Sequence, residues 1–228
     1  MKNIETFLSH DGKKAHSKGA VVPPIYQNSL FTMKDWDDID KAFDDRTNNY
    51  IYSRGNNPSA KIVEEKLARV CGGDTAKLFA SGMGAVSAVM LSCIEKGSHV
   101  VTIKNIYGPA NNILQSYFKP KFGIEITYIS GTDIAEFEKA IQPNTTLIYL
   151  ESPSSVILSL QDLKAVATLA KKQNIKTAID NTWASPLFQH PLKLGVNFEF
   201  DSCSKYIGGH SVVVAGLVVG ARADVVSL

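Results

Sequence analysis

The feature that most constrains the fold is an alternation, from about Thr75 onward, of short β-branched runs with amphipathic stretches. This pattern is typical of a mostly parallel sheet with helices on both faces, so it predicts an α/β domain. The expected strands are Lys77–Ala80, Val100–Ile103, Glu125–Ile129, Thr146–Leu150, Lys176–Asp180 and Phe198–Ser202.

Two helices are predicted between these strands. Ile134, Phe137 and Ile141 share one helical face after Asp133, and Pro143 ends the run. The second helix is indicated by an apolar face of Leu160, Leu163, Ala167 and Ala170. Residues 1–52 have little periodicity, and they predict an extended arm with one helix around Trp36–Phe43.

Charge and cysteine usage exclude several classes of protein. The 24 basic and 22 acidic side chains give a net charge of +2 without blocks, which indicates neither a nucleic-acid partner nor a membrane surface. Cys71, Cys93 and Cys203 are widely separated, and the histidines show no ligand spacing, so no disulfide framework and no metal are expected. Met1–His10 does not resemble a signal peptide, and Val212–Val219 is too short to span a bilayer. We therefore expect a soluble, cytoplasmic protein.

Ligands of open parallel sheets gather beyond the carboxyl ends of the strands. In this sequence that rule selects Ser81–Met83, Tyr107, Glu151, Asp180 and Ser202–Lys205.

Lys205 is the candidate nucleophile. It lies between the hydroxyls of Ser202 and Ser204 and a following glycine pair. A lysine that forms a Schiff base needs low-dielectric surroundings, which expose a neutral amine. The alternative is a lysine on an ordinary loop.

Two further segments suggest binding of a phosphorylated, cationic ligand. Ser81, Gly82 and Met83 end a strand and open a helix, where unpaired N–H groups could meet a phosphate. Asp180 ends a buried strand, and a pyridinium nitrogen would suit its carboxylate. The alternatives are a tight turn without ligand and an aspartate that caps the next turn.

An arginine and two tyrosines complete the candidate set. Arg54 lies beside Tyr52 in a polar loop, and a guanidinium group suits phosphate oxygens. Tyr107 precedes Gly108-Pro109, where its ring could lie on the face of a cofactor. A solvated turn and a tyrosine packed at a strand end remain open as alternatives.

Taken in order, these segments resemble the cysteine and methionine metabolism family of pyridoxal-phosphate enzymes, which includes cystathionine β-lyases, γ-synthases and γ-lyases. The resemblance runs from about Val21 to Gly216. Its segments are Tyr52-Ser53-Arg54 with Asn57-Pro58, Ser81-Gly82-Met83, Tyr107-Gly108, Glu151-Ser152-Pro153-Ser154, Asp180-Asn181-Thr182, and Ser202-x-Ser204-Lys205-Tyr206 with Gly209-His210-Ser211.

The resemblance implies a fold type I large domain that binds pyridoxal 5′-phosphate. It implies that Lys205 carries the cofactor, that Asp180 faces the ring nitrogen and that Tyr107 stacks on the ring. The phosphate ligands implied are Ser81, Gly82, Met83, Ser202 and Ser204. Tyr52 and Arg54 would reach the phosphate of a neighbouring subunit, so a homo-oligomer, dimer or tetramer, would share its active sites.

The domain organisation expected from the resemblance is an arm over residues 1–52 that contacts a neighbouring subunit and a cofactor-binding domain over residues 53–228. The family's smaller C-terminal domain, with its arginine for the substrate carboxylate, is not expected within these 228 residues. Asp201 stands where the family often has a histidine.

The expected activity is a carbon–sulfur β-lyase that acts on cystathionine or a related thioether amino acid, with Lys205 and Tyr107 as the catalytic residues. Many γ-acting members carry Asn-Pro where Ser155 and Val156 stand here, and Trp183 is also more similar to the β-lyase branch. A γ-synthase, a γ-lyase and an inactive cofactor-binding or assembly module remain as alternatives.

Overall fold

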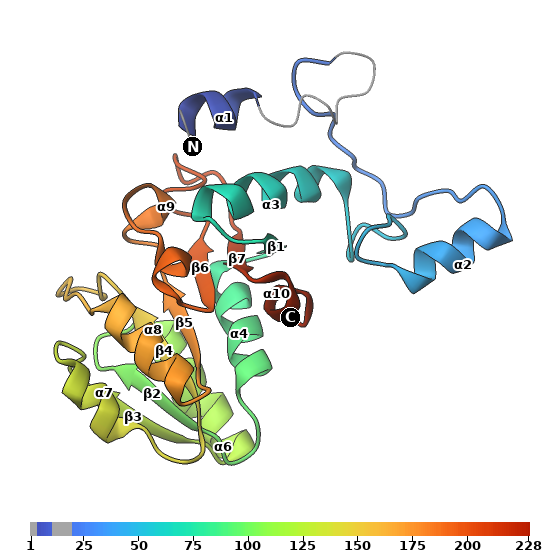
Figure 1. Ribbon diagram of the computed structural model, residues 1–228. Helices are drawn as coiled ribbons and strands as arrows, with labels where there is room; N and C mark the ends of the chain where they lie inside the picture. Colours follow the sequence, from blue (N-terminus) through green and yellow to red (C-terminus); the bar gives the residue numbers. More distant parts are fainter. Residues whose placement is uncertain (1–3, 11–19) are drawn as a thin grey trace. The chain divides into compact units, whose positions relative to one another are not determined.

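The computed structural model describes residues 4–10 and 20–228 (Figure 1). The chain divides into two compact units, Met1–Val70 and Cys71–Leu228. No helix in the described part of the chain is both long enough and apolar enough to cross a membrane.

The first unit contains helices and extended segments. Its helices are α1 (Ile4–His10), α2 (Trp36–Asp44) and α3 (Pro58–Cys71), the last of which ends at the first residue of the second unit. Asp35 caps α2 by accepting a hydrogen bond of 2.9 Å from the backbone N–H of Asp38. The helix expected around Trp36–Phe43 is therefore confirmed.

The second unit is built on one seven-stranded sheet in the order β1-β7-β6-β5-β4-β2-β3. The strands from β6 to β3 along this order pair in parallel, whereas β7 is antiparallel to both β1 and β6. The mostly parallel α/β sheet is confirmed, and so is each predicted strand. The strands are β1 (Thr75–Phe79), β2 (His99–Ile103), β3 (Glu125–Ile129), β4 (Thr145–Glu151), β5 (Lys176–Asp180), β6 (Phe198–Ser202) and β7 (Gly216–Gly220).

Strand β7 was not predicted from the sequence. All of its residues are buried, and both of its neighbours run in the opposite direction. Because neither face of the strand meets solvent, the alternation of apolar and polar residues that marks a half-buried strand is missing.

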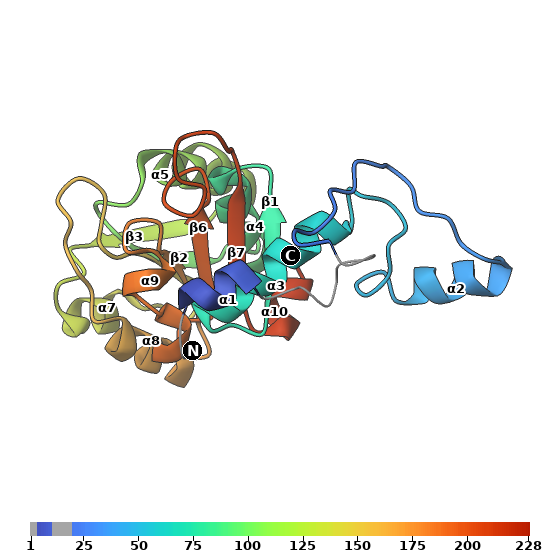
Figure 2. The ribbon, with the colours of Figure 1, turned by 90° about the horizontal axis from the view of Figure 1, so that it is seen from above.

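Helices cover both faces of this sheet, with α4 and α5 on one face and α7 and α8 on the other (Figures 1 and 2). The helices of this unit are α4 (Gly82–Cys93), α5 (Gly108–Ile113), α6 (Lys119–Phe122), α7 (Ile134–Ala140), α8 (Leu163–Lys172), α9 (Ser185–Phe188) and α10 (Arg222–Val226), with a π-helical turn η3 (Leu114–Phe118) and a 3₁₀ turn η4 (Pro191–Leu194).

Both predicted helices are present, with one correction. Asp133 caps α7 and Asp162 caps α8, each through a 3.0 Å hydrogen bond from a backbone N–H in the first turn. Because α8 starts after Asp162, Leu160 lies outside the helix. Its assignment to the buried face was wrong, since its side chain is 65% exposed.

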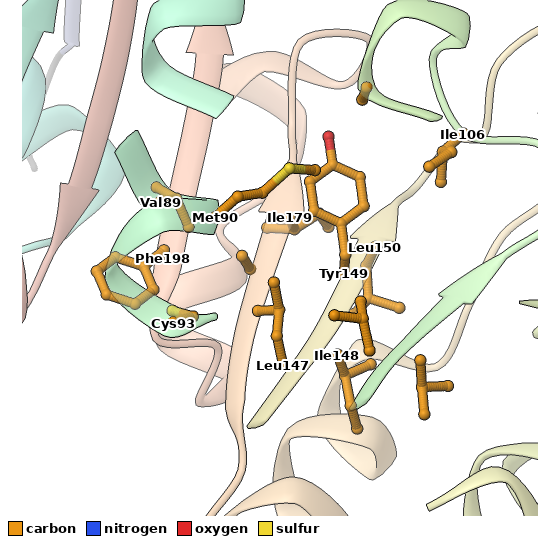
Figure 3. Packing of buried hydrophobic residues seen from close by; sticks show 14 of the residues in the cluster. Val89, Met90, Cys93, Ile106, Leu147, Ile148, Tyr149, Leu150, Ile179 and Phe198 are labelled. Carbon is orange, nitrogen blue, oxygen red and sulfur yellow. The ribbon is translucent and has the colours of Figure 1, made fainter. Parts of the chain in front are cut away.

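The core lies between the sheet and its helices, where Met90 of α4 packs with Tyr149 and Ile179 of the central strands (Figure 3). All three side chains are fully buried. Burial of an apolar side chain of this size stabilises a fold by roughly 1.5–3 kcal/mol. These packed central strands therefore hold the residues at their ends in fixed positions.

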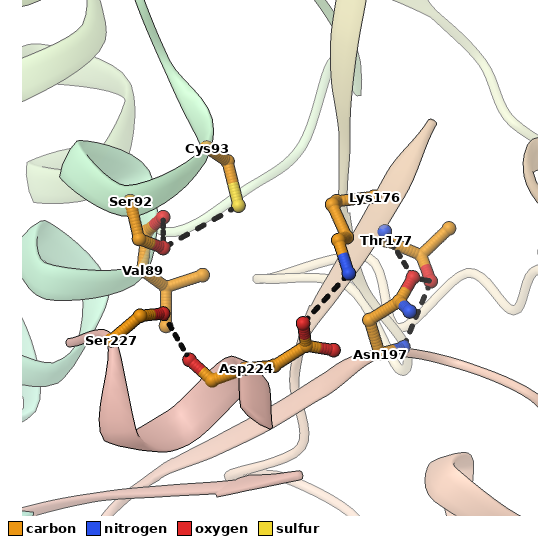
Figure 4. A network of polar contacts seen from close by, with 8 residues as sticks. All are labelled: Val89, Ser92, Cys93, Lys176, Thr177, Asn197, Asp224 and Ser227. Atoms are coloured by element: carbon orange, nitrogen blue, oxygen red, sulfur yellow. Dashed lines mark hydrogen bonds and ion pairs between the residues drawn. The ribbon is translucent and has the colours of Figure 1, made fainter. Parts of the chain in front are cut away.

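Polar contacts fix the opposite, amino-terminal ends of β5 and β6 (Figure 4). The Asn197 side-chain oxygen accepts hydrogen bonds from the backbone N–H and the hydroxyl of Thr177, at 2.9 and 3.0 Å. Lys176 forms a 2.7 Å ion pair with Asp224 of α10. These contacts hold the register of the two strands that carry Asp180 and Ser202.

Candidate active site

A cavity of about 980 Å³ opens at the carboxyl ends of β4, β5 and β6. All the predicted site residues of the second unit line it, namely Ser81, Gly82, Met83, Tyr107, Asp180, Ser202, Ser204 and Lys205. Segments far apart in the sequence are therefore brought to one place, as the strand-end rule predicted.

The turn between β1 and α4 is shaped to receive an anion. Ser81 caps α4 by accepting a 3.0 Å hydrogen bond from the Gly84 N–H, while the first N–H groups of a helix have no partner within it. A Cβ added at Gly82 would lie 2.9 Å from the Ser202 Cβ, so only glycine allows this close approach. Ser204 also lines the cavity, and its hydroxyl accepts a 3.2 Å hydrogen bond from the Ala215 backbone N–H. This arrangement fits a phosphate group.

Lys205 lies in the loop after β6. Its Nζ donates a 3.3 Å hydrogen bond to Ser202 Oγ, and its backbone N–H bonds to the Ser202 carbonyl at 3.0 Å. The side chain is exposed, so the low-dielectric surroundings expected from the sequence are not formed by the residues that the structure describes. The amine instead faces an open cavity that a ligand could fill.

Asp180 caps the following turn, which is one of the two alternatives that the sequence left open, and it also lines the cavity. Its Oδ1 accepts a 3.0 Å hydrogen bond from the Thr182 N–H, so the residue caps the following turn. That bond uses one oxygen, and the residue still lines the cavity. Burial raises the pKa of Asp180, while the bonds from Thr182 and the charge of Lys205 act in the opposite direction. A cationic ligand group would favour the carboxylate further.

Glu151 is a site residue to which the sequence assigned no role, although it ends β4 at the predicted edge. It is buried, and its carboxyl accepts hydrogen bonds from the Tyr107 N–H and from the Ser155 hydroxyl, the latter at 2.6 Å. Burial raises its pKa to about 7, and nearby Asp180 adds to the shift. Glu151 therefore fixes the backbone of Tyr107, whose ring is 41% exposed and lines the cavity.

Tyr52 and Arg54 lie in the first unit. The Arg54 guanidinium carbon lies 4.9 Å from the centre of the Tyr52 ring, and both side chains are exposed. Their approach to the phosphate of a neighbouring subunit stays a prediction.

Cys203, two residues before Lys205, packs as a small buried side chain. Burial raises the pKa of its thiol to about 12. A thiol with such a pKa is a poor nucleophile at neutral pH.

The raised pKa of Glu151 predicts a pH-dependent stability. An acid whose pKa is higher in the fold than in the unfolded chain stabilises the fold at low pH, and the contribution is lost as the pH rises through about 7. As the pH rises from 5 to 8, the unfolding free energy of wild type should therefore fall by about 2 kcal/mol relative to that of Glu151→Gln. Urea denaturation at the two pH values measures this difference.

Glu136→Gln is the control, because hydrogen bonds from Ser130 lower the pKa of Glu136, the opposite direction to the shift of Glu151. An equal pH dependence of wild type and Glu151→Gln would contradict the assignment.

Comparison with known proteins places the chain in a group of sulfur amino-acid enzymes. It is 37% identical over 212 residues to an L-methionine gamma-lyase of Porphyromonas gingivalis, covering 92% of this chain and 53% of that protein. It is also 37% identical over 221 residues to a cystathionine beta-lyase MetC of Staphylococcus haemolyticus, covering 97% and 54% of the two chains.

Among solved structures, a Campylobacter jejuni protein assigned as an O-acetylhomoserine (thiol)-lyase matches with a TM-score of 0.90 and 30% identity, over 97% of this chain and 54% of that one. It contains N′-pyridoxyl-lysine-5′-monophosphate. The chain spans about half the length of the relatives it matches. The family model for Cys/Met metabolism PLP-dependent enzymes matches residues 5–227, and the chain belongs to this family.

Proposed function

We propose that the protein is a pyridoxal-phosphate-dependent carbon–sulfur β-lyase that cleaves cystathionine or a related thioether amino acid to a thiol, a keto acid and ammonia. The observation that carries the proposal is the meeting of Lys205, Asp180 and the Gly82 turn in one cavity. Pyridoxal phosphate is the cofactor of the family to which the chain belongs.

The residues present fit this cofactor. Lys205 would hold it through Nζ, and the Asp180 carboxylate would pair with the protonated ring nitrogen. The Gly82 and Met83 N–H groups, with the hydroxyls of the neighbouring serines, would bind the phosphate, and the Tyr107 ring would lie on the cofactor face. The closeness of Gly82 to Ser202 supports this fit, because a side chain at Gly82 would occupy the cradle.

When bound, pyridoxal phosphate supplies an electron sink that stabilises negative charge at the substrate Cα. In the proposed reaction the substrate amine takes the place of Lys205, and the freed Nζ then removes the Cα proton. The Tyr107 hydroxyl donates a proton to the departing sulfur, so the thiol leaves neutral. Water then enters, and the products are the thiol, a keto acid and ammonium.

The segment after β4 supports β-cleavage over γ-cleavage. Ser155 occupies the position where many γ-acting members carry asparagine, and its hydroxyl donates a 2.6 Å hydrogen bond to Glu151. Val156 follows in a left-handed conformation with φ of 68°, a conformation that proline cannot adopt. The relatives include both β- and γ-lyases, so the choice between them is part of the proposal.

We also infer a cytoplasmic homo-oligomer, dimer or tetramer. In this assembly residues 1–52 contact a neighbouring subunit and residues 53–228 bind the cofactor. The exposed Tyr52 and Arg54 side chains of the first unit support shared sites.

Product analysis tests the reaction itself. Incubation of the cofactor-loaded protein with cystathionine should yield homocysteine and pyruvate in equal amounts. Lys205→Ala should yield neither, because the proton acceptor is lost. Cysteine with 2-oxobutyrate would show γ-cleavage, and absence of product from a cofactor-loaded protein would contradict both lyase assignments.

Tyr107→Phe tests the proton donor. It should lower the turnover number by about 10²-fold or more, because the leaving sulfur loses its acid. Tyr117→Phe is the matched control, since Tyr117 has the same 41% exposure but does not line the cavity. Equal turnover of the two variants would remove Tyr107 from this role.

Gly82→Ala tests the phosphate cradle without measuring turnover. The added Cβ would meet Ser202 at 2.9 Å, so the dissociation constant for pyridoxal phosphate should rise about tenfold or more. Gly108→Ala is the control, because a Cβ there would meet nothing within 4 Å. Equilibrium dialysis gives both constants, and unchanged binding by Gly82→Ala would place the phosphate elsewhere.

A further inference from the structure

A second group of chemically active side chains lies buried in the second unit and takes no part in the proposed reaction. Cys71, Glu199 and Asp201 are 0%, 0% and 1% exposed. One sulfur or oxygen atom from each lies within 4.8 Å of the others. Along β6, Phe200 and Ser202 line the cavity, so the alternation of a strand directs Glu199 and Asp201 to the opposite face.

The Asp201 carboxyl group lacks the partners that a buried acid requires. Neither oxygen of Asp201 has a hydrogen-bond partner within the described ranges. The Cys71 thiol lies within hydrogen-bonding reach of the Glu199 carboxyl. Oε1 of Glu199 accepts a 2.7 Å hydrogen bond from Asn181. No ion pair to either acid is found among the residues described. A buried charge without compensation is costly, so something must satisfy these groups.

Protonation of the buried acids does not explain why the Asp201 carboxyl group has no hydrogen-bond partner. If Asp201 were a neutral acid, its hydroxyl would be a buried donor that needs an acceptor nearby. The Asp201 carboxyl group neither donates nor accepts a hydrogen bond in the described structure, although Glu199 and Cys71 are close to it. A positive ion between the three side chains would satisfy all the unpartnered oxygens together.

We propose that Cys71, Glu199 and Asp201 form a structural site for a divalent metal ion, with Zn²⁺ as the best match. Zn²⁺ accepts thiolate sulfur and carboxylate oxygen in one site, whereas Mg²⁺ and Ca²⁺ prefer oxygen alone. Two free oxygens on Asp201 allow it to bind through both and complete four ligands.

The distances suit such an ion. Zn–S bonds of about 2.3 Å and Zn–O bonds of about 2.0–2.2 Å place ligand atoms from different residues about 3.5 Å apart in a near-tetrahedral site. The three groups, already within 4.8 Å, would need to close by about 1 Å. Since the cluster is closed to solvent, the ion would enter as the chain folds and would hold β6 from the face opposite the cavity. This proposal does not depend on the proposed function.

Metal content after refolding tests the site directly. The full 228-residue chain with its cofactor is unfolded, refolded with Zn²⁺ or Co²⁺ and freed of excess metal by gel filtration. We expect one tightly held ion per chain and, for Co²⁺, a thiolate-to-metal charge-transfer band in the difference spectrum against protein refolded without metal. A folded wild-type chain with neither retained metal nor this band would overturn the proposal.

Variants assign the ligands. Cys71→Ser should abolish the thiolate band, and Asp201→Asn should weaken metal binding by more than the roughly 10- to 100-fold caused by loss of an outer-shell partner. Cys93→Ser is the matched control, because Cys93 is also buried but lies outside the cluster. Retention of the band by Cys71→Ser, or its loss in Cys93→Ser, would refute the assignment. Should a ligand variant fail to fold, the wild-type measurement decides alone.

Discussion

The candidate site depends on the parallel register of three strands that end at the same edge of the sheet. Pairing of β4 with β5 sets Glu151 beside Asp180, and pairing of β5 with β6 sets Asp180 beside Phe200, two residues before Ser202. Each strand end therefore contributes one group at a fixed spacing. The buried core beneath these strands holds the spacing, because packed side chains tolerate little displacement.

Two acids at this edge of the sheet, Glu151 and Asp180, are desolvated by burial. Glu151 and Asp180 have raised pKa values, and burial is the largest cause for each. Such groups favour a ligand with positive charge, and the Gly82 turn, which lines the same cavity, favours a negative one. A ring with a protonated nitrogen at one end and a phosphate at the other matches this polarity, which is the physical reason that the cavity suits pyridoxal phosphate.

Local patterns predicted much of the fold and the cavity. Strands β5 and β6 follow from β-branched and aromatic runs, the start of α7 from the capping residue Asp133, and the site from the position of polar residues at strand ends. What the sequence missed depends on distant neighbours. The antiparallel β7 has no alternation because both faces are buried, and Cys71 meets Glu199 and Asp201 only through the packing of segments more than a hundred residues apart. The exposure of Lys205 also could not be foreseen from its small flanking residues.

The central claim is that Lys205, opposite Asp180, is the side chain that holds the cofactor. Borohydride reduction of the cofactor-loaded protein, followed by peptide mapping, tests it most directly, because reduction makes the link permanent. Lys104 also lines the cavity and is the natural competitor. We expect the added cofactor mass on the peptide that contains Lys205, and its recovery on the peptide that contains Lys104 would contradict the account.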